Sequence, residues 1–138
     1  MRGLLAVVAP LVVAGCAALP QGGGGGCSTA DGALDDAAFV IATAPAAGAR
    51  VSSGFAVSGC SRTFESVVNW RLLARDGSLL AEGHATGGGV DGPGPFAFAV
   101  PFSLAERQLG TLEVFEEDAS GGEGFPPGRT VLPLELLP

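Results

Sequence analysis

The chain has 138 residues, of which 47% are hydrophobic, and its seven arginines stand against fourteen aspartates and glutamates, for a net charge of −7 at neutral pH. This length suits one domain with a short additional segment. The sequence has no lysine and no cluster of arginines, which excludes a nucleic-acid-binding surface and a polybasic attachment to anionic lipid. Its single histidine excludes a zinc site built from several histidines.

Residues 1–15 have the features of a signal peptide. Arg2 gives a positive start, and the apolar run at 4–14 is shorter than the ~20 residues of a membrane-spanning helix. The run closes on Val13-Ala14-Gly15-Cys16, which resembles the lipobox of bacterial lipoproteins, with valine where leucine is commoner. The resemblance implies cleavage before Cys16 and a diacylglycerol on its thiol. An ordinary secretory signal that contains a cysteine, or a buried N-terminal helix, is the alternative.

The lipobox resemblance also implies a location outside the cytoplasm. Ala17 follows the cysteine, where an aspartate is associated with retention in the inner membrane. The anchored chain is therefore expected on the outer face of the plasma membrane, or on the outer membrane of a cell that has two. Residues 16–37 include five consecutive glycines and show no apolar periodicity, so they predict a flexible tether.

From residue 38 to residue 138 the sequence predicts an all-β domain. Short apolar stretches alternate with turn residues about every ten positions, and no window sustains a helical period. Seven strands in about a hundred residues are typical of an immunoglobulin-like antiparallel β-sandwich. The predicted strands are 39–44, 54–59, 66–74, 79–85, 96–104, 112–117 and 130–137.

The clearest strand signal is the alternation at 96–104. Large apolar residues occupy every second position, which places their side chains on one face and predicts that this face is the core. Pro101 interrupts the run, so the strand is expected to be an edge strand or to bulge there. The alternating residues are Phe96, Phe98, Val100, Phe102 and Leu104.

Two further features refine the predicted sandwich. Trp70 shares a strand face with Val68 and Leu72, which favours a buried tryptophan between the sheets, the alternative being a surface ring that stacks on a sugar. The dipeptide Asp76-Gly77 predicts a two-residue hairpin turn in which both residues have positive φ.

The stretch Val57-Ser-Gly-Cys-Ser-Arg-Thr-Phe-Glu-Ser-Val-Val-Asn-Trp-Arg-Leu72, preceded by Pro45-x-x-Gly-x-x-Val51, resembles the immunoglobulin-like domain of bacterial spore germination proteins. The resemblance implies a sandwich fold and supplies no enzymatic activity. Within the shared motif we predict that Phe64 and Val68 belong to the core. Glu65 is a candidate binding residue, or else a solvated side chain that pairs with a nearby arginine.

The search for catalytic and cofactor sites yields no candidate. His84 lies at the end of a predicted strand, and no nucleophile or metal-binding motif surrounds it. Gly87-x-Gly89-x-x-Gly92 matches a dinucleotide-binding pattern by letter, but prolines lead from it into a strand rather than a helix. The carboxylates at 116–118 are interpreted as solvated side chains, and calcium binding is the alternative. We therefore expect no enzyme activity, no cofactor and no metal.

Two cysteines remain once Cys16 is assigned to lipid. In an oxidising compartment Cys27 and Cys60 predict a disulfide that fixes the tether to the domain, the alternatives being two free thiols or an intermolecular link. Phe125 precedes two prolines between the last two strands, so it is a candidate contact residue at a loop tip. The alternative, which is the favoured interpretation, is that its ring folds back over the sandwich end.

The function predicted from these features is that of a lipid-anchored, non-catalytic immunoglobulin-like module in the bacterial cell envelope. Such a module binds a protein or a glycan through its end loops or an exposed edge strand. The alternative is a structural spacer or assembly subunit of an envelope complex. An enzyme with an unrecognised site is the least favoured interpretation.

Overall fold

The computed structural model describes residues 26–29, 31–123 and 127–138. The predicted signal peptide, Cys16 and Phe125 lie outside these described residues. The described residues contain no helix that is long and apolar enough to cross a membrane.

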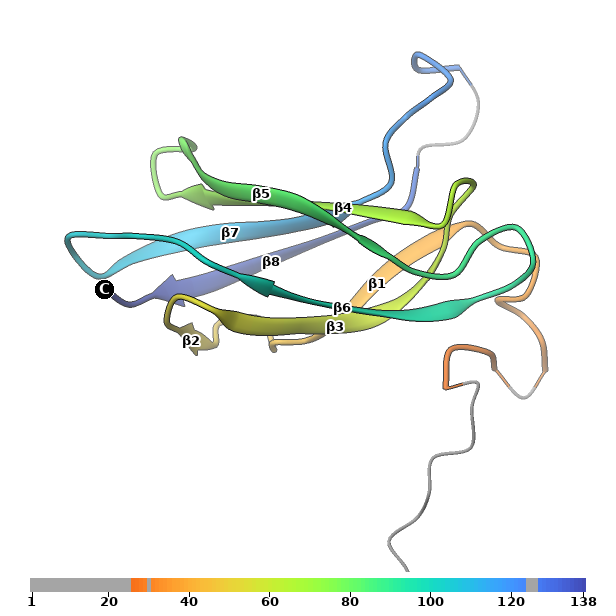
Figure 1. The fold of residues 1–138 in the computed structure, drawn as a ribbon, viewed down its shortest axis with the longest axis horizontal. Coiled ribbons are helices and arrows are strands. Elements are labelled where there is room, and N and C mark those ends of the chain that lie inside the picture. Colours follow the sequence, from red (N-terminus) through yellow and green to blue (C-terminus); the bar gives the residue numbers. More distant parts are fainter. Residues whose placement is uncertain (1–25, 30, 124–126) are drawn as a thin grey trace, which may run out of the picture.

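The chain folds into two β-sheets that face each other (Figure 1). The smaller sheet has the strand order β1-β3-β6 and the larger one β2-β8-β7-β4-β5. This arrangement confirms the predicted all-β, immunoglobulin-like sandwich. The strands are β1 Phe39–Ala44, β2 Arg50–Val51, β3 Phe55–Arg62, β4 Val67–Ala74, β5 Leu79–Thr86, β6 Gly94–Val100, β7 Gln108–Phe115 and β8 Arg129–Leu136.

The seven predicted strands correspond to all of these except β2. That strand has two residues and pairs in parallel with the end of β8, Arg50 opposite Glu135 and Val51 opposite Leu136. Two residues are too few to show alternation, so β2 gave no sequence signal.

Alternating side chains of the two sheets fill the core between them. In β4 and β7 every second residue is buried, which is the period-two pattern of a half-buried strand. The Trp70 ring stacks on that of Phe98 with centroids 5.2 Å apart and planes 6° apart, and Trp70 is only 7% exposed. Phe98 and Phe102 are partly buried against a core that includes Val57, Val68, Leu72, Phe96, Val100, Leu112, Val114 and Leu134.

The prediction that Phe64 belongs to the core is wrong, because its side chain is 77% exposed. Strand β3 ends at Arg62, and Phe64 lies in the turn that leads to β4. The inward positions of β3 continue through Ser61 to Thr63, which is 2% exposed, so the next residue faces outward.

The predicted two-residue hairpin turn between β4 and β5 is also wrong. The loop has three residues, 75–77: Gly77 N donates to Ala74 O at 2.9 Å, and Ala74 N donates to Ser78 O at 2.8 Å. Gly77 has a φ of 85°, whereas Asp76 is not among the described residues with positive φ. Asp76 accepts hydrogen bonds from Ser78 N and Oγ at 2.9 and 2.6 Å. This pattern matches a type I turn followed by a glycine bulge.

Strand β6 is an edge strand, as the proline at 101 predicts. It ends at Val100, earlier than the predicted end at 104. Phe102 and Leu104 nevertheless continue to pack against the core. The alternation therefore predicts the buried face correctly beyond the point where ladder pairing stops.

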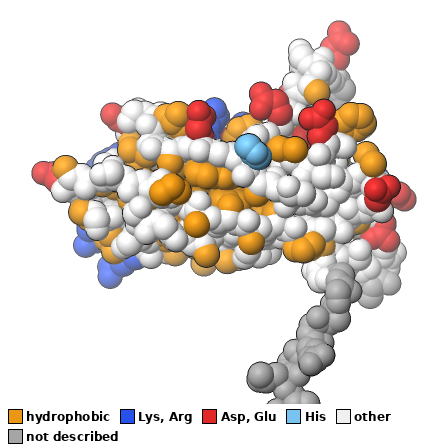
Figure 2. Space-filling view, viewed as in Figure 1, with side chains coloured by type: hydrophobic (Ala, Val, Ile, Leu, Met, Phe, Trp, Pro, Cys, Tyr) orange, Lys and Arg blue, Asp and Glu red, His pale blue; other side chains and the backbone are white. Residues whose placement is uncertain are grey.

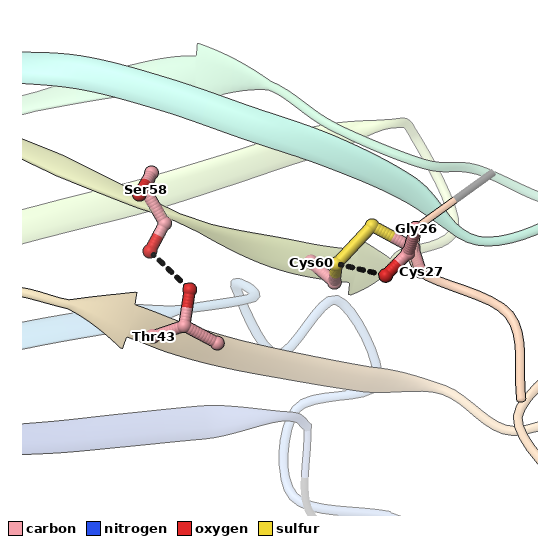
Figure 3. Close-up of a disulfide and its surroundings, with 5 residues drawn as sticks. All are labelled: Gly26, Cys27, Thr43, Ser58 and Cys60. Atoms are coloured by element: carbon pink, nitrogen blue, oxygen red, sulfur yellow. Dashed lines mark hydrogen bonds between the residues drawn. A yellow bond between two sulfur atoms is a disulfide. The ribbon is translucent and has the colours of Figure 1, made fainter. Parts of the chain in front are cut away.

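A disulfide between Cys27 and Cys60 joins the N-terminal segment to the outer face of the smaller sheet (Figure 3). Cys60 points outward because its neighbours Gly59 and Ser61 face the core. Cys27 is 5% exposed. The carbonyl oxygen of Gly26 lies 3.7 Å from Cys60 Sγ, a contact rather than a hydrogen bond because a disulfide sulfur carries no proton.

Candidate functional site

The connections between β3 and β4, β5 and β6, and β7 and β8 meet at one end of the sandwich, at the right of Figure 1. We call the described parts of these connections, residues 63–66, 87–93, 116–123 and 127–128, the loop end. Thr63 N donates to Gly88 O at 3.0 Å, and Gly87 N donates to Ser66 O at 2.9 Å. The first two connections are thereby held together by backbone hydrogen bonds.

Phe64 is the largest and most exposed apolar side chain in the described part of the loop end, and its backbone is fixed. Its N–H donates to Glu116 Oε1 at 2.7 Å, which links the first connection to the third. Ser66, two residues on, has a φ of 59°, a left-handed conformation that is uncommon outside glycine. The exposed ring therefore projects from a tightly bonded turn.

A hollow of about 140 Å³ lies beside this ring. Glu65, the binding residue suggested by the sequence, lines it together with Phe64 itself. Within the described residues Glu65 forms no ion pair, because the nearby Arg71 pairs with Glu113. The remaining lining residues are Val67, Asn69, Glu116, Glu117 and Ala119.

The glycine run at 87–89 allows the connections to approach each other closely. A Cβ atom at Gly88 would lie 2.1 Å from Gly94 N, and one at Gly89 would lie 2.0 Å from Ser66 Oγ. Strand β6 begins at Gly94, directly after this connection, so no helix opens there. These glycines are therefore needed for the close packing of the connections. Residues 87–94 lack the turn into a helix that a dinucleotide site requires.

Negative charge gathers at the loop end, as Figure 2 shows on its right-hand side. The pKa of Asp118 is lowered, chiefly by the hydrogen bond from Ser120 Oγ and then by that from Ser120 N. Its carboxyl group is thus ionised at neutral pH. The carboxylates on the three connections are Glu65, Asp91, Glu116, Glu117, Asp118 and Glu123.

Arg62 lies between the loop end and the N-terminal segment. Its guanidinium donates to the backbone carbonyls of Asp36 and Val90, each at 3.2 Å. A hollow of about 410 Å³ surrounds it, lined also by Asp35 and Asp91. In residues 26–29, 31–123 and 127–138, no three His, Cys, Asp or Glu side chains are grouped so as to hold a metal ion.

The outer face of the larger sheet carries a second aromatic side chain near this end. The guanidinium carbons of Arg71 and Arg129 lie 5.4 and 5.6 Å from the centroid of the Phe115 ring, which are cation–π distances. The exposed His84 lies opposite Asn69 on the neighbouring strand. Because arginines of this chain already flank Phe115, it is a weaker candidate contact than Phe64.

The structure thus places Glu65 at the candidate site and adds Phe64, which sequence reasoning missed. The alternation of buried and exposed positions along β3 could have shown that Phe64 is exposed. Residues 57, 59, 61 and 63 face the core, so residue 64 faces outward. Trp70 is buried, which rules out the sugar-stacking interpretation of that residue. Phe125 cannot be placed, since it lies outside the described residues.

A family model and one solved structure match this chain, and the family match agrees with the sandwich architecture. A model of the family described as Gmad2, immunoglobulin-like domain of bacterial spore germination, matches residues 39–123. No curated protein matches the chain. The crystal structure of CopC from Methylosinus trichosporium OB3b is similar at 19% sequence identity and a TM-score of 0.42, covering 74% of this chain and 95% of that chain.

Proposed function

Because the chain belongs to the family of immunoglobulin-like domains of bacterial spore germination, we propose that it is a non-catalytic binding module whose loop end contacts a partner protein. The description of the family names no ligand. The proposal is supported chiefly by one observation, the 77% exposure of Phe64 on a turn that Glu116 holds in place.

An exposed aromatic ring on a fixed backbone is a favourable contact for a protein partner. Interface energy concentrates in a few large side chains, aromatic ones among them, that enter pockets on the partner. The turn that carries the ring loses little backbone freedom on binding, because the Phe64 N–H is already bonded to Glu116. Carboxylates surround Phe64, so the matching surface has an apolar pocket with a basic rim.

A glycan partner is less well supported. Sugar binding in sandwich domains uses a flat, accessible aromatic face, and the sole tryptophan of the sequence is buried against Phe98. Phe64 stands among carboxylates whose charge favours a cationic protein surface over a neutral or acidic polysaccharide. We therefore propose a protein partner and treat a glycan as an outcome of the test.

The proposed location is the outer face of the plasma membrane, or the outer membrane of a cell that has two membranes, with lipid on Cys16 as the anchor. This part of the proposal is supported by the lipobox resemblance at 13–16 and by the absence of lysine from the sequence, which leaves no basic cluster for binding anionic lipid. Two acyl chains, each methylene contributing about 0.8 kcal/mol, suffice for stable attachment.

The test is capture of a partner from detergent-solubilised cell envelope with the wild-type chain and with Phe64→Ala. The variant should remain folded, since the side chain is exposed, and should capture the partner at least about tenfold less well. Leu109→Ala is the matched control, because Leu109 is also exposed, at 59%, but lies near the start of β7, away from the loop end.

Equal capture by the Phe64 variant would overturn the loop-end proposal. Protease treatment of the envelope before capture should abolish the interaction. Capture that survives protease and is lost after glycan hydrolysis would identify a glycan ligand instead. Absence of any captured partner would favour a structural spacer.

A further inference from the structure

The outer edge of β5 is a long strand edge without cover. β5 ends the five-stranded sheet and, in the described part of the chain, pairs only with β4. Its eight residues contain no proline. Figure 1 shows it at the open side of the sandwich, across from β6.

The other strand edges of the described sheets are blunted. β2 has only two residues, and β6 contains Pro95 and is followed by Pro101. The edge of β1 is bonded by Thr130 of β8, whose Oγ1 donates to Val40 O at 2.8 Å and accepts from Ala42 N at 3.1 Å. Folded proteins usually protect their strand edges by such means, so the open edge of β5 marks it as a pairing surface.

The centre of β5 is Glu82-Gly83-His84, and its side chains are arranged for self-pairing. Glu82 and His84 lie opposite Arg71 and Asn69 on β4, and both are exposed on the outer face of the sheet. Arg71 forms its ion pair with Glu113, which leaves Glu82 outside the ion pairs of the described residues. Figure 2 shows the histidine on the face that looks toward the reader.

Gly83 faces the opposite way, onto the ring of Trp70. A Cβ atom there would lie 2.6 Å from Trp70 Cζ2, so the position requires glycine for close packing. The inner face of β5 around it carries only small residues, Ala81 and Ala85. The edge therefore presents a carboxylate and an imidazole, two residues apart, with a flat strand between them.

We propose that two copies of this chain associate by antiparallel pairing of β5 with β5, with Gly83 opposite Gly83 across a two-fold axis. In this register Glu82 of each copy lies opposite His84 of the other. Directly opposed Cβ atoms in antiparallel strands are about 4.5–5.5 Å apart, within reach of a hydrogen bond from an imidazole N–H to a carboxylate. The symmetry forms this pair twice.

The distribution of charge supports a second copy as the occupant of the edge. Carboxylates gather at the loop end, and antiparallel pairing of β5 directs the two loop ends away from each other, which minimises their repulsion. A strand pairing of this size buries little surface, so the dimer is expected to be weak in solution. Confinement on one membrane would raise the effective concentration of the two copies.

Sedimentation velocity of the full chain carrying Cys16→Ser, over a series of concentrations, tests the proposal. The chain should shift from monomer to dimer as its concentration rises. Glu82→Lys should weaken the dimer by at least about tenfold. Exchanging the two residues in the double variant Glu82→His/His84→Glu should restore it, because the same pairs re-form in the same register.

Glu106→Lys is the matched control, since it makes the same charge change at an exposed position outside β5, and it should leave the dimer unchanged. Circular dichroism should show the same fold for every variant. A chain that is monomeric at all concentrations would overturn the proposal, and an extended segment of another protein would then be the remaining occupant. A dimer that Glu82→Lys leaves intact, or that the exchange fails to restore, would also overturn it.

Discussion

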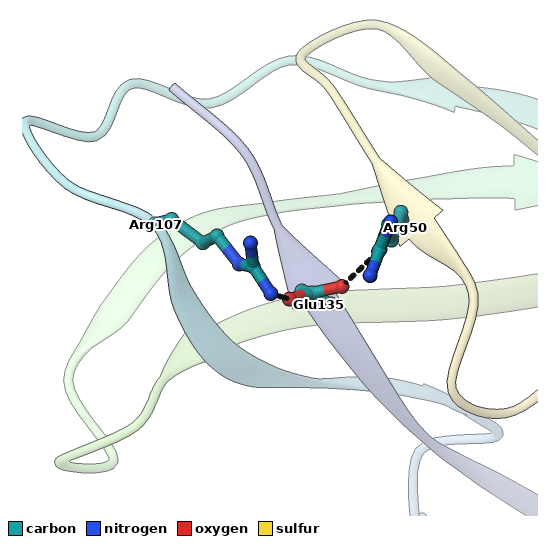
Figure 4. Close-up of polar contacts among 3 residues, drawn as sticks. All are labelled: Arg50, Arg107 and Glu135. Carbon is teal, nitrogen blue, oxygen red and sulfur yellow. Dashed lines mark hydrogen bonds and ion pairs between the residues drawn. The ribbon is translucent and has the colours of Figure 1, made fainter.

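Glu135 joins three parts of the chain at the end of the sandwich opposite the loop end. It lies on β8 and forms ion pairs with Arg50 of β2 and with Arg107, which precedes β7 (Figure 4). The pKa of its carboxyl group is lowered, chiefly by the hydrogen bond from Arg50, and the charge of Arg107 contributes further. The ionised form is therefore favoured in the folded protein.

Glu135→Gln should destabilise the protein at neutral pH and have little effect in acid. A carboxyl whose pKa is lowered on folding adds stability above its unfolded value, and this contribution is lost as pH falls through the folded value, below the ordinary 4.5. Urea unfolding of both proteins at pH 7 and near pH 3 measures the change. A difference that stays constant over this range would contradict the assignment.

The β4–β5 hairpin shows how one residue fixes an element. Gly77 has a φ of 85° and nothing within 4 Å of where a Cβ atom would lie, so only the backbone conformation requires glycine there. The sequence correctly located the turn and the direct pairing of its strands. It did not distinguish a two-residue from a three-residue loop, because Asp-Gly suits both and the hydrogen bonds of Asp76 to Ser78 decide between them.

Gly77→Ala should lower the free energy of unfolding by about 1 kcal/mol, the cost of a left-handed conformation in a residue with a Cβ atom. Gly77→Asn should cost less, because asparagine tolerates that conformation. Equilibrium urea unfolding of the three proteins provides the comparison. If alanine and asparagine destabilised the hairpin equally, crowding rather than backbone conformation would be the cause.

The elements that the sequence predicted are those with a local signal. Short apolar stretches separated by turn residues located seven strands, and the alternation at 96–104 located the buried face of β6. The missed element, β2, depends on β8, because Arg50 and Glu135 are 85 positions apart in the chain. A pattern within a short stretch of sequence cannot indicate a pairing between residues so far apart in the chain.

The candidate site was likewise predictable only where a local sequence pattern exists. The sequence pointed to Glu65, the neighbour of the exposed Phe64. Phe64 was assigned to the core on its hydrophobicity and on a motif, although its place in the alternation indicated the surface. Its fixed backbone depends on Glu116, 52 positions away. The convergence of three connections at one end is a property of the sheet topology and could not be read from any of them alone.

At the scale of the whole molecule, the Cys27–Cys60 disulfide ties the N-terminal segment to the sandwich. The sequence predicted this pairing from the number of cysteines and the compartment, and the structure has the two cysteines bonded at a sequence separation of 33. A loop of that length gives the bond a substantial effect on the unfolded chain.

Reduction of this disulfide should lower the free energy of unfolding by up to about 4 kcal/mol in the chain-entropy description. The measurement is urea unfolding of the Cys16→Ser chain with and without a reducing agent that does not absorb, such as a phosphine. Maleimide trapping under denaturing conditions should label neither cysteine before reduction and both afterwards. Full labelling of both before reduction would show that the bond does not form in the cell.

The position of that disulfide also limits how far the domain can lie from an anchor on Cys16. Cys60 lies near the end of β3 that leads into the loop end, and eleven positions separate Cys27 from Cys16, a reach of roughly 40 Å at most. In a chain anchored through Cys16, the tether therefore joins the domain on the side of the loop end, within that distance of the bilayer. The extracytoplasmic segment of a neighbouring membrane protein lies within the same reach.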